Sequence, residues 1–486
     1  MGVIASFRSK PLAIAVLSAL AITACSASSD GGSIATSQKT STTKAPPVEY
    51  TVPLVKGPVT GQNAPWTATT DSTRLPAAGY EEAEYFLDGT ATSYQRKGTW
   101  GKNGEWGATP DTTAKYRTRI LVRRPTDPAK FNGTVVVEWF NVSAGFETAP
   151  DYLFMQQELL RRGYAWVGVS AQAAGINGAD TGVAGLKPLR QSDPERYDTL
   201  HHPGDRYSYD IYTQTARAIR TPGSVDVLDG LEVKQIIANG ESQSAFRMVT
   251  YINAIQPLAG AYDGFLVHSR FSGATPLAEE DGINPARIRT DQEVPVLVVE
   301  SESDVLEHFA ARQPDSKYYR LWEMAGTSHV DASTFADALG CDKPSNSGPA
   351  RFIMRAALAA LTAWVKDTDN APERAPRIEI DRTDRTVERD LNGNALGGIR
   401  TPQLDVPLAT LSGEGNTGGN FCRLAGTTSP FDAATLGALY LDRDDYLERF
   451  LIDIEIARST DYILGADGPE MVAEARKLAA DAPFDS

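Results

Sequence analysis

A tight turn between a strand-like and a helix-like segment constrains this chain more than any other feature. Residues 233–238 read as a buried strand, and residues 245–255 read as a helix. Between them stands Gly240-Glu241-Ser242-Gln243-Ser244. Small residues on both sides of Ser242 let the strand and helix backbones pass closely, and such an elbow presents a serine hydroxyl for attack. We therefore predict that Ser242 is a nucleophile, although Ser244 stands where Gly is commoner.

The rest of the chain alternates between strand-like and helix-like segments. This alternation is typical of βαβ units and a mostly parallel sheet. Strands are predicted over residues 83–87, 116–124, 133–139, 164–170, 263–268, 294–300 and 318–323, and helices over 151–162, 209–219 and 349–366. Ligands of such sheets bind beyond the carboxyl ends of the strands, which is where Ser242 is expected.

Two segments interrupt this alternation. Residues 172–205 form an insertion with little regular pattern. After residue 371 the chain becomes polar and rich in Gly, and from residue 429 it is helical and acidic. This C-terminal extension, about residues 375–486, is predicted either to cap the site or to brace the sheet.

The partners of Ser242 are expected downstream, because the chain order for this kind of elbow is Ser, acid, His. Of the five histidines, only His329 follows the last predicted strand, in a loop whose Gly lets the ring reach the elbow. His268 ends a strand and is a candidate pocket-lining residue, whereas His308 is assigned to a helix or loop surface. His329 is the predicted base.

The acid of the triad is expected just after the strand predicted over residues 294–300. Counting along this loop places Asp304 in the orienting position, where it would hold the imidazole tautomer and stabilise the imidazolium. Glu302 is the alternative, because a shift of two residues keeps the same side of the loop.

An oxyanion hole needs backbone N–H groups aimed at the developing charge. One donor is predicted from Gln243, directly after Ser242. The other is predicted from Asn141 or Val142, in the loop after the strand over residues 133–139. The Asn141 side chain is an additional candidate donor.

The sequence of the N-terminal region indicates an export signal and not a part of the folded domain. Arg8 and Lys10 precede a short apolar run, which is typical of a signal peptide over residues 1–24. The residues around Cys25 look like a bacterial lipobox, which implies acylation of Cys25. Residues 25–47 are rich in Ser, Thr, Ala and Gly and are predicted to be a disordered tether. The predicted location is the outer face of a bacterial membrane, held by this anchor alone, with plain secretion as the alternative.

The net charge of the chain argues against nucleic acid as a partner. Removing residues 1–24 takes away Arg8 and Lys10 and no acidic residue, so 45 Lys and Arg face 62 Asp and Glu, a net charge of −17. This charge opposes binding to nucleic acid.

Cys341 and Cys422 can form one bridge in an oxidising compartment, and their pairing stays open.

The cluster His201-His202-Pro203-Gly204-Asp205 contains residue types that ligate metals. Adjacent histidines diverge in an extended chain, and no second cluster completes a site. We interpret this cluster as structural loop chemistry, and we predict neither a metal nor a cofactor.

Several short motifs resemble the "alpha/beta hydrolase domain" family of bacterial proteins. The resemblance extends from about residue 52 through GNALGGIRTP and SPFD near the C-terminus. The motifs that carry it are NVSAG, GYAWVGVSAQ, DPERY, HHPGD, GESQSA, RQPDS and WEMAGTSHVD. This resemblance implies an α/β-hydrolase fold over residues 48–486 and hydrolysis of an ester, without naming the substrate.

The expected activity is hydrolysis of a small-molecule or lipid-like carboxylic ester through an acyl-enzyme on Ser242, with His329 as base. One alternative is acyl transfer to an alcohol or a cell-envelope glycan, which the same triad serves. Another is a non-catalytic surface-binding lipoprotein that keeps the fold. The oligomeric state is not predicted.

Overall fold

The computed structural model describes residues 51–61, 63–65, 74–179, 187–278, 282–334, 339–419 and 421–484. All of them belong to the unit Pro47–Ser486. The predicted signal peptide, the lipidated Cys25 and the tether lie outside the described residues. Among the helices of the described part, none combines the length and the apolar character needed to cross a membrane.

Within the described residues, nine strands form one mixed sheet in the order β1-β2-β3-β5-β4-β6-β7-β8-β9. The strands are β1 (Leu54–Lys56), β2 (Tyr80–Lys97), β3 (Gly107–Pro125), β4 (Thr134–Trp139), β5 (Ala165–Val169), β6 (Gln235–Glu241), β7 (Gly264–His268), β8 (Val296–Ser301) and β9 (Tyr319–Met324). Strands β5, β4, β6, β7, β8 and β9 pair in parallel, whereas β1, β2, β3 and β5 pair antiparallel. The sheet is therefore mostly parallel, as the alternation of elements predicts.

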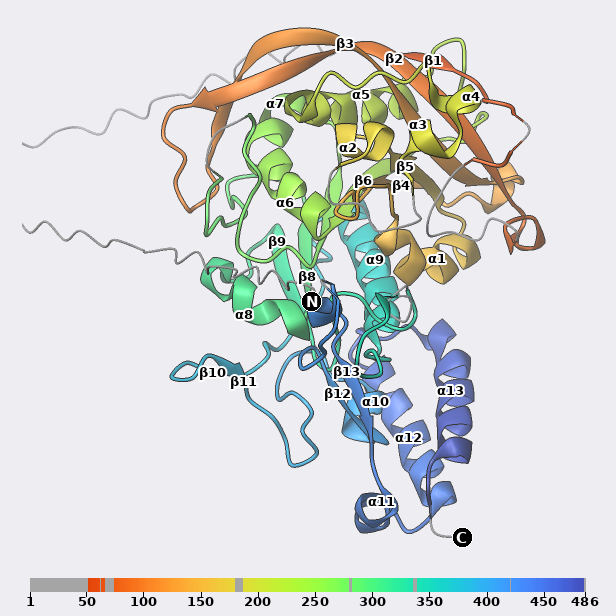
Figure 1. Cartoon of the computed structure of the whole chain (residues 1–486), viewed down its shortest axis with the longest axis vertical. Helices are drawn as coiled ribbons and strands as arrows, with labels where there is room; N and C mark the ends of the chain where they lie inside the picture. Colours follow the sequence, from red (N-terminus) through yellow and green to blue (C-terminus); the bar gives the residue numbers. More distant parts are fainter. Residues whose placement is uncertain are drawn as a thin grey trace, which may run out of the picture. The chain divides into compact units, whose positions relative to one another are not determined.

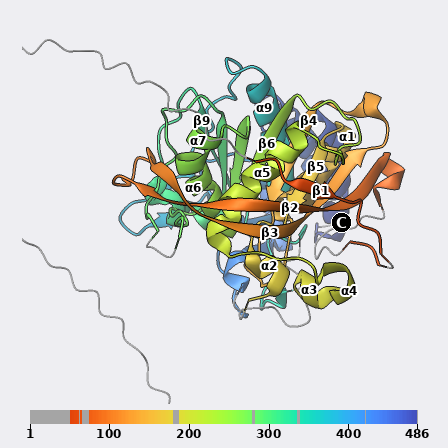
Figure 2. The ribbon, with the colours of Figure 1, turned by 90° about the horizontal axis from the view of Figure 1, so that it is seen from above.

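The hairpin of β2 and β3 is much longer than the sequence pattern predicts. Predicted strands over residues 83–87 and 116–124 cover only its middle, and the two strands run across the molecule as paired ribbons (Figure 2). Residues 107–115 lack apolar alternation, so only backbone pairing with β2 reveals this part of the strand. Trp100 and Trp106 stack at 4.5 Å between ring centroids near the turn, and both belong to the large core of the sheet.

Successive residues of the parallel strands face two separate cores. On β6, Ile236 packs with the helices α5 (Ser208–Arg220) and α6 (Gln243–Thr250). The next residue, Ile237, packs with α1 (Pro150–Arg161) and α9 (Ala350–Lys366). This alternation follows from the twofold period of a strand, and it leaves the sheet covered by helices on both faces (Figure 1).

The turn between strand β6 and helix α6 contains fewer residues than predicted. The strand continues to Glu241 and the helix begins at Gln243, so Ser242 alone separates them. The helix continues as a π turn over Tyr251–Ile255 and then as α7 (Gln256–Ala259). The elbow is therefore a single residue wide.

The insertion contains short helices where the sequence shows little regular pattern. They are α2 (Ala173–Asn177), α3 (Leu189–Ser192) and α4 (Pro194–Tyr197). Ile176, Leu189 and Tyr197 pack with Phe86 of β2 in a small separate core. The insertion is thus anchored to the long hairpin.

The C-terminal extension has two parts. The first holds β10 (Ile380–Asp381), β11 (Thr386–Val387), α10 (Pro402–Asp405), β12 (Ala409–Ser412) and β13 (Thr427–Pro430). The second holds α11 (Ala433–Leu439), α12 (Arg443–Arg458) and α13 (Gly468–Asp481). Arg355 of α9 pairs with Asp467 at 3.0 Å and Glu470 at 2.6 Å. The helical part therefore braces the helix layer of α9.

A disulfide joins Cys341 to Cys422, across 81 positions of sequence. It links the segment after His329 to the first part of the C-terminal extension. The pairing that the sequence leaves open is thus present in the structure.

Candidate active site

Ser242 occupies a strained elbow at the end of β6. Its φ of 56° and ψ of −118° lie outside the regions that side chains other than glycine favour. The N–H of Ser242 donates to the carbonyl oxygen of His268 at 3.0 Å, which fixes the turn to β7. A Cβ on Gly240 would lie 3.0 Å from the Cβ of Ser244. Small residues on both sides are therefore required by the close approach of strand and helix.

His329 and Asp304 meet beside this elbow. Nδ1 of His329 lies 3.0 Å from both carboxylate oxygens of Asp304, which stands in the turn between β8 and α8 (Val305–His308). The hydroxyl of Ser303 accepts the backbone N–H of His329 at 2.8 Å, and the hydroxyl of Ser301 donates to the carboxylate of Asp304. These contacts hold the ring and its carboxylate in one orientation.

The charges of this pair shift both pKa values. Burial by itself raises the pKa of Asp304, but the charge of His329 and hydrogen bonds from His329 and Ser301 bring it below its ordinary value. Asp304 is therefore an anion beside the imidazole, as an orienting carboxylate must be.

Glu302, the alternative acid, does not contact the imidazole. One of its oxygens accepts the N–H of Gly326 at 2.8 Å. The other accepts Nη2 of Arg389 at 2.8 Å and the N–H of Gly413 at 3.0 Å. Glu302 is fully buried and ties the acid loop to the His329 loop and to the C-terminal extension.

Glu241 is a site residue that sequence reasoning missed. Its Oε1 lies 2.9 Å from Nε2 of His329, and its Oε2 accepts Nδ2 of Asn141 at 2.9 Å. The sequence shows a carboxylate next to Ser242, but only the folded structure shows that it reaches the ring. Burial lowers the pKa of His329, yet the charges of Asp304 and Glu241 and hydrogen bonds to both raise it well above its ordinary value.

The predicted oxyanion donors differ in their availability. The N–H of Asn141 donates to the carbonyl oxygen of Thr148 at 3.0 Å, and the Asn141 side chain donates to Glu241. Val142 is the other backbone alternative, and its N–H has no hydrogen-bond partner among the described residues. Gln243 is the first residue of α6, so its N–H has no acceptor within the helix. Gln243 and Val142 are the two backbone donors that remain.

The other histidines lie outside this constellation. His268 is buried, and its Nδ1 lies 2.8 Å from Asp151, which also accepts Nδ2 of Asn239 at 2.9 Å. This pair supports the strand ends beneath the elbow. The surface position predicted for His308 is wrong, because α8 packs against the sheet and buries the ring completely. Burial also brings the pKa of His308 well below its ordinary value.

The cluster around His201 and His202 joins the insertion to the elbow helix. Nε2 of His202 bonds the carbonyl oxygen of Ala171 at 2.9 Å. Asp205 accepts Nη2 of Arg247 in α6 at 2.9 Å and the N–H of Ala173 at 2.9 Å. Within the described residues, no three His, Cys, Asp or Glu side chains are grouped so that they could hold a metal.

Two phenylalanines form an aromatic wall beside the ring of His329. Phe271 stacks on His329 with ring centroids 5.5 Å apart, and Phe246 meets Phe271 edge-on at 5.8 Å. Phe246 lies one helical turn after Ser242, and its backbone N–H donates to the carbonyl oxygen of Ser242. Both phenylalanines are partly exposed. The wall therefore offers an apolar surface next to the reactive groups.

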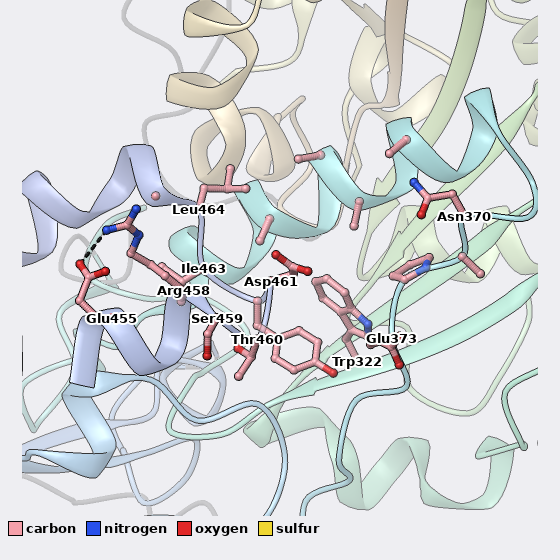
Figure 3. A pocket seen from close by; sticks show the side chains of 18 residues that line it. Trp322, Asn370, Glu373, Glu455, Arg458, Ser459, Thr460, Asp461, Ile463 and Leu464 are labelled. Atoms are coloured by element: carbon pink, nitrogen blue, oxygen red, sulfur yellow. Dashed lines mark hydrogen bonds and ion pairs between the residues drawn. The ribbon is translucent and has the colours of Figure 1, made fainter. Parts of the chain in front are cut away.

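A cavity of about 650 Å³ lies elsewhere, between α9 and the segment after α12 (Figure 3). Trp322 and Tyr462 stand in its lining, and an ion pair of 2.6 Å joins Arg458 to Glu455 at its side. None of Ser242, Asp304 and His329 lines this cavity. It is separate from the candidate active site.

Comparison with protein families matches residues 55–473 to the alpha/beta hydrolase domain family. The chain belongs to this family. A comparison with curated proteins found no match.

Solved structures of low identity resemble parts of this alpha/beta hydrolase. A serine hydrolase without a lid from Xanthomonas campestris is 11% identical, with 50% of this chain and 85% of that chain covered and a TM-score of 0.28. Fungal esterase from Rhizomucor miehei is 11% identical, with 60% and 88% covered and a TM-score of 0.29. A serine hydrolase homologue from Coxiella burnetii is 10% identical, with 44% and 84% covered and a TM-score of 0.26.

Proposed function

We propose that this protein hydrolyses carboxylic esters through an acyl-enzyme on Ser242. The observation that carries the proposal is the pair of contacts from Nδ1 of His329 to Asp304, made beside a serine in a strained elbow. The contact of Nε2 with Glu241 brings the reactive nitrogen next to the residue that precedes Ser242. These contacts support a nucleophile, a base and an orienting acid from the segments that follow β6, β9 and β8.

In the proposed reaction, Oγ of Ser242 forms a bond to the ester carbonyl carbon while Nε2 of His329 takes the hydroxyl proton. The carbonyl oxygen becomes an oxyanion, which the N–H groups of Gln243 and Val142 would stabilise. The bond to the leaving alcohol then breaks, and Nε2 gives its proton to that alcohol. A water molecule attacks the acyl-Ser242 with His329 again as base, which releases the acid and restores the hydroxyl.

The aromatic wall supports an ester with an apolar acyl or alcohol group. Phe271 and Phe246 offer partly exposed ring surface beside His329, and burying such surface on substrate binding is favourable. A series of p-nitrophenyl esters of increasing acyl length measures this preference.

The test of the proposed function compares wild type, Ser242→Ala and Ser459→Ala with p-nitrophenyl acetate and butyrate. Ser459 is an exposed serine at the end of α12, so its variant is a control for loss of a hydroxyl. We expect Ser242→Ala to lose at least about 10⁴-fold in kcat and all labelling by a fluorophosphonate probe. Equal hydrolysis by wild type and Ser242→Ala would contradict the proposal. Product analysis with an added alcohol separates hydrolysis from acyl transfer.

We also propose that the enzyme is exported and anchored by acylation of Cys25. Two features support this location: the lipobox-like sequence at Cys25, and a disulfide between Cys341 and Cys422 of a kind that persists in oxidising compartments. We expect the full chain to fractionate with membranes and Cys25→Ala to be released. Membrane association that survives this substitution would contradict the lipid anchor.

A further inference from the structure

The imidazole of His329 lies between two carboxylates. Nδ1 is 3.0 Å from Asp304, and Nε2 is 2.9 Å from Oε1 of Glu241. A neutral imidazole has one N–H donor and one acceptor nitrogen, whereas an imidazolium donates from both nitrogens. Two carboxylate partners therefore match the charged ring, in which Nε2 carries a proton and cannot act as a base.

Ser242 and Glu241 require the same nitrogen. In the proposed reaction Nε2 must accept the Ser242 hydroxyl proton, but among the described contacts Nε2 is bonded to Glu241 and not to Ser242. We propose that Glu241 is a positioning residue that holds His329 as an imidazolium in the free enzyme and must release Nε2 before Ser242 is activated. This inference rests on the proposed function of Ser242 and His329.

The surroundings of Glu241 make it a fixed partner rather than a mobile one. Its side chain is 4% exposed, and Nδ2 of Asn141 bonds its second oxygen at 2.9 Å and its carbonyl oxygen at 3.1 Å. Asn141 follows β4, so a second parallel strand supports the carboxylate. Glu241 thus has little freedom to turn away while Asn141 holds it, so the contact with Nε2 is released by loss of the Nε2 proton rather than by movement of the carboxylate.

The groups that face His329 come from three neighbouring strands. Asp304 follows β8, Glu241 ends β6, and Phe271, which carries no charge, follows β7. On the loop of His329 itself, Oδ1 of Asp331 accepts the N–H of Ser333 at 2.9 Å and its hydroxyl at 2.6 Å, whereas Oδ2 has no hydrogen-bond partner among the described residues. Asp331 also interacts electrostatically with Arg351 and His268, and burial raises its pKa to about 6. Glu241 is therefore the carboxylate that competes directly for Nε2.

This arrangement predicts the acid side of the pH profile. Activation releases the Nε2 proton to solvent, and the neutral ring then accepts the proton of Ser242. Activity is lost as pH falls through the pKa of His329, and because Glu241 raises that pKa, the loss begins at a higher pH than with Asp304 alone. The profile of kcat/KM reports the free enzyme, in which the Glu241 contact is formed, whereas that of kcat reports the substrate complex.

The decisive variant is Glu241→Gln, which keeps the size of the side chain and removes its charge. We expect the acid limb of kcat/KM to move to lower pH by about 1 unit, since a nearby opposite charge shifts a pKa by 1–3 units. The control is Glu414→Gln, which removes one exposed carboxylate that lies 3.7 Å from Arg389 and does not touch the ring. Its acid limb should stay in place.

A second variant and a second readout keep the inference testable. Glu241→Asp withdraws the carboxylate by one methylene group and should move the acid limb in the same direction by a smaller amount. Titration of His329 by NMR in the Ser242→Ala background follows the ring without requiring activity, and adding Glu241→Gln should lower its pKa. An acid limb and a ring titration that both stay unchanged in the Glu241 variants would overturn the inference. If Ser242→Ala keeps its activity, the proposed function fails instead.

Discussion

The elbow that carries Ser242 and the two loops that carry Asp304 and His329 are built in different ways. The elbow is made from consecutive residues, since Gly240, Ser242 and Ser244 create it by their size and their position between β6 and α6. The two loops rely on distant partners. Glu302 of the acid loop bonds Gly326, Arg389 and Gly413.

The same dependence extends to the segment after His329. The Val330 N–H donates to the carbonyl oxygen of Leu424 at 3.1 Å, and the Asn346 N–H donates to that of Ala425 at 2.8 Å. The disulfide through Cys422 lies directly before these acceptors. A local motif can thus present the proposed nucleophile, while the proposed base and its acid depend on the C-terminal extension.

The largest expected effect among the loop residues is that of Asp304→Asn. The amide cannot hold the imidazole in the required tautomer or stabilise the imidazolium, so we expect kcat to fall by about 10⁴-fold. Steady-state kinetics with p-nitrophenyl acetate measures this loss. A loss below tenfold would assign the orienting role to another carboxylate.

Glu302→Gln tests whether support by the C-terminal extension controls the base. Both oxygens of Glu302 accept hydrogen bonds, so an amide nitrogen at either place would face a donor, at a cost of about 1–3 kcal/mol. We expect a fall in kcat of about 10- to 100-fold, with a shift of the His329 loop and an unchanged elbow in a crystal structure.

The control for this variant is Glu414→Gln. Glu414 is exposed and lies 3.7 Å from the same guanidinium of Arg389, so the charge change is equal. Its kcat should match wild type, because exposed pairs of this kind contribute little. Equal losses in the two variants would show that charge near Arg389, rather than the clamp of Glu302, is what matters.

The smallest expected effect on activity comes from removing the disulfide with Cys341→Ser and Cys422→Ser. The free energy of unfolding should fall by about 2–4 kcal/mol, since the bridge restrains a long loop of the unfolded chain. Activity should fall only a few-fold, because the backbone hydrogen bonds to Leu424 and Ala425 remain. Chemical denaturation of wild type and the double variant, with and without a thiol reductant, measures this free energy of unfolding. A reductant that destabilises the double variant as much as wild type would contradict this account.

Sequence patterns predicted the parallel strands and their helices well because each has a clear apolar period. The strand over residues 264–268 and the helix over residues 350–366 are examples, with ends within one residue of the predicted ones. The hairpin ends over residues 88–97 and 107–115 were missed, since polar residues there are held by pairing across the hairpin. His308 was misplaced for a similar reason, because burial by distant segments leaves no local pattern.

The sequence by itself determined the elbow, its serine and the order of the acid and histidine loops, because these depend on residue size and on periods of a few residues. The tertiary structure distinguishes the two candidate acids, since Asp304 reaches Nδ1 of His329 while Glu302 binds the neighbouring loop. It alone revealed that Glu241 reaches Nε2 of the same ring. Hydrogen bonds act over about 3 Å, and only packing brings side chains from separate strands to that distance.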